Sequence, residues 1–355
     1  MRKETAVIII DTGFSLDAMM TASRILAVCD LSTGLLREGE PTLLNAESLS
    51  DFAGDPLNHG SLVLRALTAI DSDIPLILVR AYSNQVRLIR TAFENGEIKS
   101  PGWTEAFDWA VSLCKKRGYN SVTNCSFGGY THAMDGSGWE AFRLGQHIGP
   151  GKAGHILVAG AGSGDGRAIH ASCLNDGGSF SDINARQTGP TTYNLWAGLG
   201  GPVSESWTLE VFLNEQKSAH FEGAELAANF WNDRKQLTFT VSGEGSVKFR
   251  MHSPEATRFD LWINHQDDAV FTSHADPHLI AEPAVFPGVI AVGLAAGRYS
   301  SDQTESNAKP EVLLAGSGPV SFRLPEVVAE IASWLTEEPE LDVVSVRQKL
   351  CPVTL

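Results

Sequence analysis

The chain has 355 residues, of which 43% are hydrophobic and 34 are glycines, a composition typical of a soluble globular α/β protein. Its net charge of −15 and isoelectric point near 5.1 exclude a nucleic-acid surface, and its apolar runs are too short to span a membrane. Five scattered cysteines without CxxC spacing predict reduced thiols in a cytoplasmic protein. Because the first residues lead directly into a predicted strand, no signal peptide is expected.

The first predicted element is a buried strand over residues 6–14, where a run of β-branched side chains ends in Asp-Thr-Gly. Such a run is typical of a parallel sheet covered on both faces, with Asp11 at the carboxyl end of its strand, where α/β proteins place their sites. A cap of the following turn is the alternative role for Asp11. Hydrophobic-Asp-Thr-Gly is also the aspartic-protease signature, but that chemistry needs two carboxylates, so this chain would have to act as a homodimer.

A helix is expected from Asn58-His59-Gly60 onward, because apolar residues recur at helical spacing up to residue 70. A lone histidine at a helix start is more often structural than functional, and both roles stay open for His59. Further strands are predicted over residues 74–82, 121–129 and 155–166, with a helix over residues 104–117. Strands that alternate with helices predict an α/β fold with a doubly wound, mostly parallel sheet.

The strand that begins at residue 155 ends in alternating glycines, namely Gly160, Gly162, Gly164 and Gly166. Their spacing does not match the G-x-G-x-x-G pattern of nucleotide loops, and no convincing long helix follows. Glycines also allow the close approach of a backbone to a peptide-like ligand. The pattern therefore favours peptide binding over phosphate binding.

Residues 193–278 differ in character from the rest of the chain. They contain short strands of alternating apolar and polar residues, separated by Gly, Pro and Asn turns. This pattern predicts a small antiparallel β-sandwich or jelly roll, inserted into a host domain formed by residues 1–192 and 279–355. His274 and His278 lie four apart near Asp276, but Pro277 breaks any helix between them, so no metal site is assigned.

The parallel-sheet pattern resumes over residues 286–296 and 309–316, and a glycine- and proline-rich loop then leads into a helix. Ser321 stands where loop becomes helix. A hydroxyl at a helix N-terminus lies among unpaired backbone N–H groups, which favour developing negative charge. The alternative is that Ser321 only caps the helix.

Asp11, His59 and Ser321 together offer the groups of a catalytic triad. A hydroxyl needs a base to become nucleophilic, and an imidazole needs a carboxylate to fix its tautomer and stabilise its charge. The order Asp, His, Ser along the chain is that of subtilisin. Order alone is weak evidence, and the local motifs decide.

The motifs resemble those of the subtilisin-like serine proteases, or subtilases. The resemblance covers residues 5–190 and 280–340, and some subtilases carry a jelly-roll insertion like the one predicted here. Its most specific parts are the hydrophobic strand with Asp-Thr-Gly, the Asn-His-Gly turn, the strand ending in Asn-x-Ser-x-Gly, and Ser-x-x-x-Pro leading into the last helix. In chain order, the matching segments are residues 7–13, 58–63, 122–128, 157–166, 287–294, 309–316 and 321–325.

The resemblance implies that Ser321 attacks a peptide carbonyl, that His59 transfers its proton to the leaving amine, and that Asp11 orients His59. It also implies that an extended peptide lies between two backbone edges. Ser163 stands where the family has its oxyanion asparagine, and the shorter hydroxyl is expected to compensate only in part. No cofactor is expected, and calcium, which commonly stabilises subtilases, stays unassigned. The substrate-binding edges are Ser126, Phe127 and Gly128 on one side and Ala159, Gly160 and Ala161 on the other.

The predicted function is that of a serine endopeptidase acting on a protein or peptide substrate. Because no propeptide precedes the Asp strand, we expect selective intracellular processing rather than bulk degradation. A catalytically inactive subtilase fold that binds peptides or serves as a scaffold is the alternative, motivated by Ser163. The insertion is expected to gate the groove, to recognise substrate, or to mediate oligomerisation.

Overall fold

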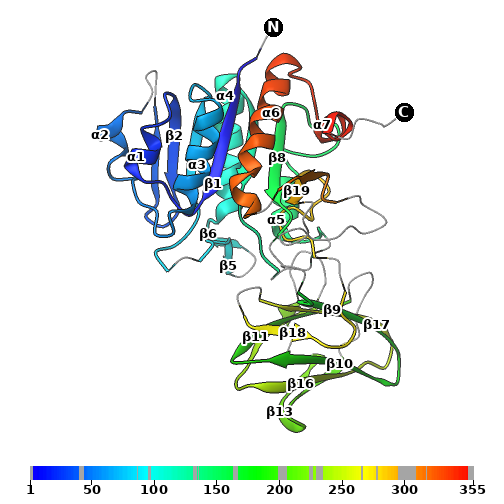
Figure 1. Cartoon of the computed structure of the whole chain (residues 1–355). Helices are drawn as coiled ribbons and strands as arrows, with labels where there is room; N and C mark the ends of the chain where they lie inside the picture. The colour runs from blue at the N-terminus through cyan, green and yellow to red at the C-terminus, as the bar shows by residue number, and fades with distance from the viewer. Residues whose placement is uncertain are drawn as a thin grey trace.

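The computed structural model contains an α/β part and, on the side toward which strand β1 (Thr5–Asp11) runs, a β-sandwich (Figure 1). The structure describes residues 3–39, 44–85, 87–94, 97–130, 134, 136–162, 167–198, 206–223, 227–228, 235–264, 267–276, 279–294, 309–316 and 318–350.

The α/β part is built on an eight-stranded sheet with the order β20-β19-β8-β7-β1-β4-β2-β3. Neighbouring strands are parallel except β2 and β3, which pair antiparallel. Parallel strands bring their carboxyl ends to one edge of the sheet, so the end of β1 lies beside the ends of its neighbours. The other strands are β2 (Ile25–Asp30), β3 (Leu35–Glu38), β4 (Leu76–Arg80), β7 (Asn120–Cys125), β8 (His155–Gly160), β19 (Val289–Leu294) and β20 (Val312–Leu314).

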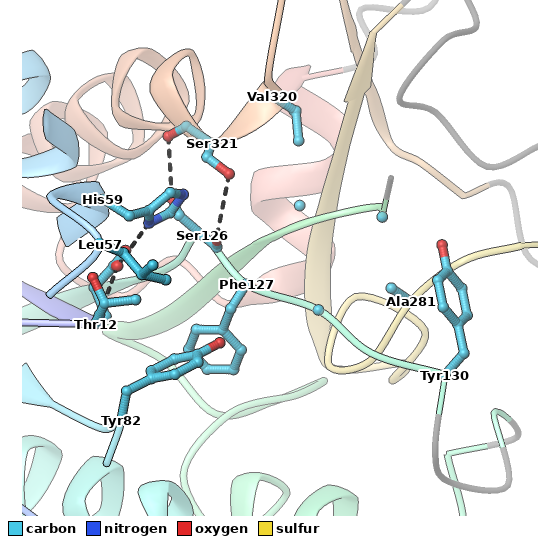
Figure 2. A pocket seen from close by; sticks show the side chains of 14 residues that line it. Thr12, Leu57, His59, Tyr82, Ser126, Phe127, Tyr130, Ala281, Val320 and Ser321 are labelled. Atoms are coloured by element: carbon cyan, nitrogen blue, oxygen red, sulfur yellow. Dashed lines mark hydrogen bonds and ion pairs between the residues drawn. The ribbon is translucent and has the colours of Figure 1, made fainter. Parts of the chain in front are cut away.

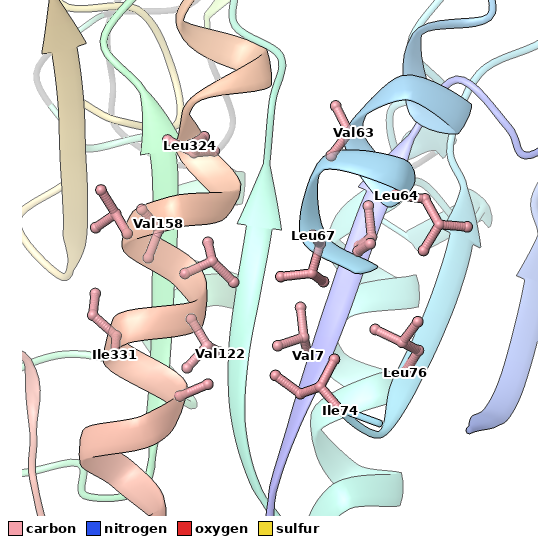
Figure 3. Close-up of a cluster of buried hydrophobic side chains, with 14 of the residues drawn as sticks. Val7, Val63, Leu64, Leu67, Ile74, Leu76, Val122, Val158, Leu324 and Ile331 are labelled. Atoms are coloured by element: carbon pink, nitrogen blue, oxygen red, sulfur yellow. The ribbon is translucent and has the colours of Figure 1, made fainter. Parts of the chain in front are cut away.

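Helices cover both faces of this sheet. Helices α3 (His59–Ile70) and α6 (Leu324–Glu337) pack against the face that carries Val7, whereas α4 (Trp103–Arg117) packs against the face that carries Ile8 (Figure 3). A strand buried on both faces needs apolar side chains at every position, which explains the continuous run in β1. The mixed α/β class and the parallel sheet predicted from the sequence are thus confirmed. The shorter helices are α1 (Leu16–Met19), α2 (Ala46–Leu49), α5 (Trp139–Leu144) and α7 (Val343–Leu350), and β5 (Ala92–Glu94) pairs with β6 (Glu97–Ser100).

Two five-stranded antiparallel sheets, ordered β13-β12-β16-β10-β18 and β14-β15-β11-β17-β9, form the sandwich. Side chains from both sheets meet in one core, where the ring of Tyr193 lies 4.7 Å from that of Phe249. The strands are β9 (His170–Asp176), β10 (Phe180–Gln187), β11 (Thr191–Ala197), β12 (Thr208–Leu213), β13 (Gln216–Glu222), β14 (Ala227–Ala228), β15 (Lys235–Val241), β16 (Gly245–His252), β17 (Ala256–Ile263) and β18 (Ala269–Phe271).

The antiparallel strands begin at His170, before the boundary expected at residue 193. The pattern of β9 is obscured because Asn175, a polar residue, is fully buried. Its side-chain amide donates hydrogen bonds to the carbonyl of Ser179 and the hydroxyl of Ser181, which satisfy it inside the sandwich. Strand β9 pairs with β17, far along the chain, so its neighbourhood gives little local signal.

The last helix also begins later than the sequence predicts, because it does not start at Ser321. Ser321 lies in a short 3-10 turn, η2 (Val320–Phe322), and α6 begins only at Leu324 with Arg323 as its N-cap residue. Pro325 stands in the first turn of α6, where its missing N–H is not needed. Ser321 therefore does not cap α6, which removes the simplest structural role for its hydroxyl.

Candidate active site

Asp11 and His59 meet at the carboxyl edge of the sheet. Asp11 ends β1, is 1% exposed, and its Oδ1 lies 2.7 Å from Nδ1 of His59 at the start of α3. The same oxygen accepts a hydrogen bond of 2.7 Å from the backbone N–H of Thr12. Because a carboxylate only accepts, Nδ1 carries the proton of a neutral imidazole, and the lone pair of Nε2 is available as a base.

Glycine at position 60 allows this approach. A Cβ atom at Gly60 would lie 2.2 Å from the carbonyl oxygen of Gly13 and 3.0 Å from Cβ of Asp11. The first turn of α3 therefore contacts the backbone after β1 directly. Glycine follows His59 in the sequence because any larger residue would clash where the helix meets the end of the strand.

Asp55 joins the two segments and was missed in the sequence. Its Oδ1 accepts a hydrogen bond of 2.7 Å from the Thr12 hydroxyl, and its Oδ2 accepts from both N and Oγ of Ser61, at 2.8 and 2.7 Å. The Thr12 hydroxyl in turn accepts from the backbone N–H of Gly60 at 3.1 Å. An aspartate a few residues before a histidine at a helix start is the signal that could have indicated this role.

The charges around His59 raise its pKa, so its imidazole binds a proton more readily than a free histidine does. Burial disfavours the charged imidazole, but the hydrogen bond to Asp11 and the charges of Asp11 and Asp55 outweigh it, so the pKa of His59 is raised. An imidazolium formed during a reaction is stabilised by the same two carboxylates. The arrangement suits a group that must accept a proton and then release it.

Ser321 lies beside His59 in Figure 2 and exchanges hydrogen bonds with Ser126. Its Oγ donates to the carbonyl oxygen of Ser126, and the Ser126 hydroxyl donates to the carbonyl oxygen of Ser321, each over 3.2 Å. The side-chain amide of Asn124 donates to the Ser126 hydroxyl at 2.9 Å. Within the described residues, the Ser321 hydroxyl is thus engaged with Ser126 rather than with the imidazole. The ring of the next residue, Phe322, lies 5.4 Å from that of His59.

One cavity of about 250 Å³ collects these groups. Asp11, His59 and Ser321 all line it, as do four of the six residues predicted to bind substrate. The other two, Ala159 and Ala161, are fully buried and do not line the cavity, and the backbone N–H and carbonyl of Ala161 are bonded to Val292 and Ala281, so the structure does not support either as a substrate-binding residue. Ser163 lies outside the described residues. The complete described lining is Asp11, Thr12, Leu57, His59, Tyr82, Ser126, Phe127, Gly128, Tyr130, Gly160, Gly162, Ala281, Val320 and Ser321.

In the part of the chain that the structure describes, no group of three or more His, Cys, Asp or Glu side chains is arranged to hold a metal ion. Of the two histidines near Asp276, His274 is among the described residues and His278 is not. No described helix combines the length and the apolar character that a membrane span requires.

Comparison with known proteins gives one informative likeness. No protein-family model matches the sequence, and no curated protein matches it. Among solved structures, the CspB protease of Clostridium perfringens is similar with a TM-score of 0.66, over 97% of this chain and 85% of that one. The fold is that of a known protease. At 13% sequence identity the likeness shows the fold alone and leaves the chemistry to the site.

Two further likenesses concern smaller parts of the chain. The pre-peptidase C-terminal domain of a Bacillus anthracis collagenase is 10% identical over 27% of this chain and 89% of its own, with a TM-score of 0.20. The CBM35 module from Paenibacillus barcinonensis is 15% identical over 29% of this chain and 94% of its own, with a TM-score of 0.17. At these scores neither likeness carries an argument.

Proposed function

We propose that the protein is a subtilisin-like serine endopeptidase, with an inserted jelly-roll domain, that hydrolyses peptide bonds through Asp11, His59 and Ser321. The observation that carries this proposal is the 2.7 Å contact between Asp11 and His59, in a cavity that Ser321 also lines. A buried carboxylate, an imidazole and a hydroxyl at one cavity are the three groups that serine hydrolysis needs. The fold likeness to a protease is consistent with it.

The reaction would begin with rotation of the Ser321 hydroxyl from the Ser126 carbonyl toward Nε2 of His59. Catalytic hydrogen bonds are often long or misaligned without substrate, so the resting contact does not exclude this step. His59 would then take the hydroxyl proton while Oγ attacks the peptide carbonyl. The tetrahedral intermediate would collapse to an acyl-enzyme as His59 gives the proton to the leaving amine, and water would release the acyl group by the same steps.

Asp11 would act by its charge and its position. It would hold Nδ1 as the proton-bearing nitrogen and stabilise the imidazolium that forms when Nε2 takes the Ser321 proton. Its burial supports this role, because an ion pair that water cannot reach is screened little. The contact between Gly60 and the backbone of Gly13 would keep the two side chains in register.

We further propose that the enzyme is an intracellular processing protease that cuts a few defined sites. Substrate would lie extended along residues 126–128 and past Gly160 and Gly162, all of which line the cavity. A mass-spectrometric digest of a denatured proteome should then yield a short list of cut sites, and cuts throughout most proteins would contradict selectivity.

A fluorophosphonate probe tests the chemistry, because it reacts only with an activated serine. The wild-type protein should be labelled, and Ser321→Ala should not. Ser50→Ala, which alters an exposed serine outside the cavity, should be labelled like the wild type. Folded wild-type protein that the probe does not label would contradict the proposal.

One observation favours a second candidate, a peptide-binding protein without catalysis. The Ser321 hydroxyl donates its hydrogen bond to a backbone carbonyl instead of to His59. A protein that uses the cavity only for binding would not need a hydrogen bond between this serine and the histidine. Such a protein would bind an extended peptide in the same cavity and release it uncut. Peptide binding by wild-type protein that the probe leaves unlabelled would favour this candidate.

A further inference from the structure

Phe322 links the turn that carries Ser321 to the helix that carries His59. Its ring centroid lies 5.4 Å from that of the imidazole, and the two ring planes are inclined by 43°. The backbone N–H of Phe322 donates to the carbonyl of Pro319 at 3.3 Å, which closes the turn η2. The residue next to the proposed nucleophile thus contacts the proposed base.

Phe322 approaches the imidazole from outside the cavity. Its side chain is not among the described residues that line the cavity, whereas His59 and Ser321 both are. It is half-buried and packs against the hydrophobic core that β1, α3 and α6 form on one face of the sheet. A ring in this position can act on His59 without contacting a substrate.

The orientation of the His59 ring needs more than its contact with Asp11. Within the described residues, the hydrogen bond of the imidazole is the one between Nδ1 and Asp11. One hydrogen bond fixes the position of Nδ1, but the ring can still tilt about it, because the χ2 torsion of histidine has a broad energy minimum. Tilting moves Nε2, the nitrogen that must reach the Ser321 hydroxyl. A second contact on the ring limits this movement, and Phe322 supplies it.

The same contact favours the charged form of the imidazole. An aromatic ring attracts a cation that lies within about 6 Å of its centroid. The separation of 5.4 Å between the two centroids is inside this range, and the charge of an imidazolium is spread over its ring. Because only 25% of the His59 side chain is exposed, water screens this attraction incompletely.

The charged groups around His59 come from β1, from the segment before α3 and from the start of α6. Burial opposes the imidazolium, whereas Asp11 at the end of β1 and Asp55 before α3 favour it, so the pKa of His59 is raised. On the side of the turn, the guanidinium of Arg323 pairs with the carboxylate of Glu326. The turn η2 itself carries no charged side chain. The effect of its ring can therefore be changed without changing the net charge near His59.

We infer that Phe322 is a positioning residue for His59, whose ring holds the imidazole toward Ser321 and stabilises the imidazolium that forms when Nε2 takes the serine proton. The inference rests on the proposed function, in which His59 is the base. An aliphatic side chain of similar size would fill the same space, but it would lack the negative face of an aromatic ring. The role thus depends on the ring and not on apolar volume alone.

Variants of Phe322 with and without a ring test this role. On the plateau of the pH profile, Phe322→Leu should lower kcat by about tenfold with little change in KM, as expected for the loss of a desolvated cation–π contact. It should also lower the pKa of His59 in an NMR titration. Phe322→Tyr keeps the ring and should match the wild type in both measurements. Phe322→Met is a second variant without a ring, and it gives the same comparison if Phe322→Leu does not fold.

Phe221→Leu is the matched control. Phe221 is also half-buried, but it lies in the sandwich, where its ring is 5.3 Å from that of Phe239. This substitution removes the same atoms at a distance from the cavity, so it should leave kcat and the pKa of His59 unchanged.

The outcomes separate this inference from the proposed function. Folded Phe322→Leu with the wild-type pKa of His59 would overturn the inference, because a merely structural role lowers the folded fraction without moving that pKa. Phe322→Tyr that loses as much activity as Phe322→Leu would overturn it as well. A folded wild-type protein that the fluorophosphonate probe does not label and that cuts no peptide would overturn the proposed function. The NMR titration needs no activity, so it decides in that case too whether the ring acts on His59.

Discussion

Ser321 and Ser126 are joined by a reciprocal pair of hydrogen bonds, in which the hydroxyl of each donates to the backbone carbonyl of the other over 3.2 Å. Ser126 follows the end of β7 and Ser321 lies in the turn before α6, so the pair connects two elements that are far apart in the chain. The side chain of Asn124 donates to the Ser126 hydroxyl and extends the connection into β7. The position of the proposed nucleophile thus depends on a neighbour that is not one of the three proposed catalytic groups.

Ser126→Ala should destabilise the fold more than Ser321→Ala. The first change removes the donor to the Ser321 carbonyl and leaves the buried amide of Asn124 without its acceptor, which costs about 1–3 kcal/mol. The second removes one hydroxyl donor, and the expected cost is about 0.5–1.5 kcal/mol. Urea unfolding of both variants beside the wild type measures the difference. A larger loss of unfolding free energy in Ser321→Ala would mean that the hydrogen bonds of Ser126 do not hold the turn η2 in place.

Asp11→Asn should lower kcat by about 10⁴-fold while leaving KM nearly unchanged, because the amide can favour the wrong tautomer of His59 and cannot stabilise its charge. Asp30→Asn is the matched control, since Asp30 ends the nearby strand β2 and is also 1% exposed. Kinetics on a cleaved peptide, corrected for the folded fraction, compare the two. Equal losses of activity would assign Asp11 a structural role only.

Much of the fold, and the places of Asp11 at a strand end and His59 at a helix start, could be predicted from local sequence. The end of an apolar run marks the carboxyl end of β1, and a helical repeat of apolar side chains marks α3 after His59. Both signals are local because the strand and the helix bury their side chains in regular periods. Ser321 is indicated by its place where the predicted loop becomes a helix, although the helix itself begins only at Leu324.

Other parts of the site could not be predicted because they depend on contacts between distant segments. Ala281 follows the sandwich in the chain and Tyr130 precedes it, yet both line the cavity, and a Cβ atom at Gly162 would meet both. Alanine and tyrosine carry no motif that would indicate such a contact. The sandwich boundary was missed for a similar reason, since β9 pairs with β17 and buries the polar Asn175. Contacts between segments that are far apart in the chain therefore explain why these features could not be predicted from the sequence.

The raised pKa of His59 sets the pH dependence of the proposed reaction. The base form of the imidazole is needed, so kcat/KM should rise with pH through the raised pKa, above the ordinary value of 6.5, and fall off below it. The same shift means that protonated His59 stabilises the fold fully below pH 6.5 and that this contribution is lost as pH rises through the folded-state pKa. A pH profile of kcat/KM and an NMR titration of the imidazole measure the two effects.

Asp55→Asn should move this profile toward lower pH, because it removes a negative charge that favours imidazolium. It should also weaken the link between Thr12 and Ser61, whose hydrogen bonds to a charged acceptor contribute about 1.5–3 kcal/mol each. Asp51→Asn, at an exposed carboxylate that pairs with Arg37, should leave the profile unchanged. The NMR titration reads the His59 pKa even in a variant with little activity. An unchanged His59 pKa in Asp55→Asn would show that its charge does not reach the ring.

Gly60→Ala should separate His59 from Asp11. The added Cβ atom would lie 2.2 Å from the carbonyl oxygen of Gly13, and both partners are backbone or close to it, so no flexible side chain can give way. The first turn of α3 must then move, and a shift of about 1 Å in a catalytic group costs roughly 100-fold in rate. We expect kcat/KM to fall at least that far and the unfolding midpoint in urea to decrease. Gly189→Ala is the control, because a Cβ atom there meets nothing within 4 Å. Wild-type activity in Gly60→Ala would mean that the close contact between α3 and the end of β1 does not set the geometry of the site.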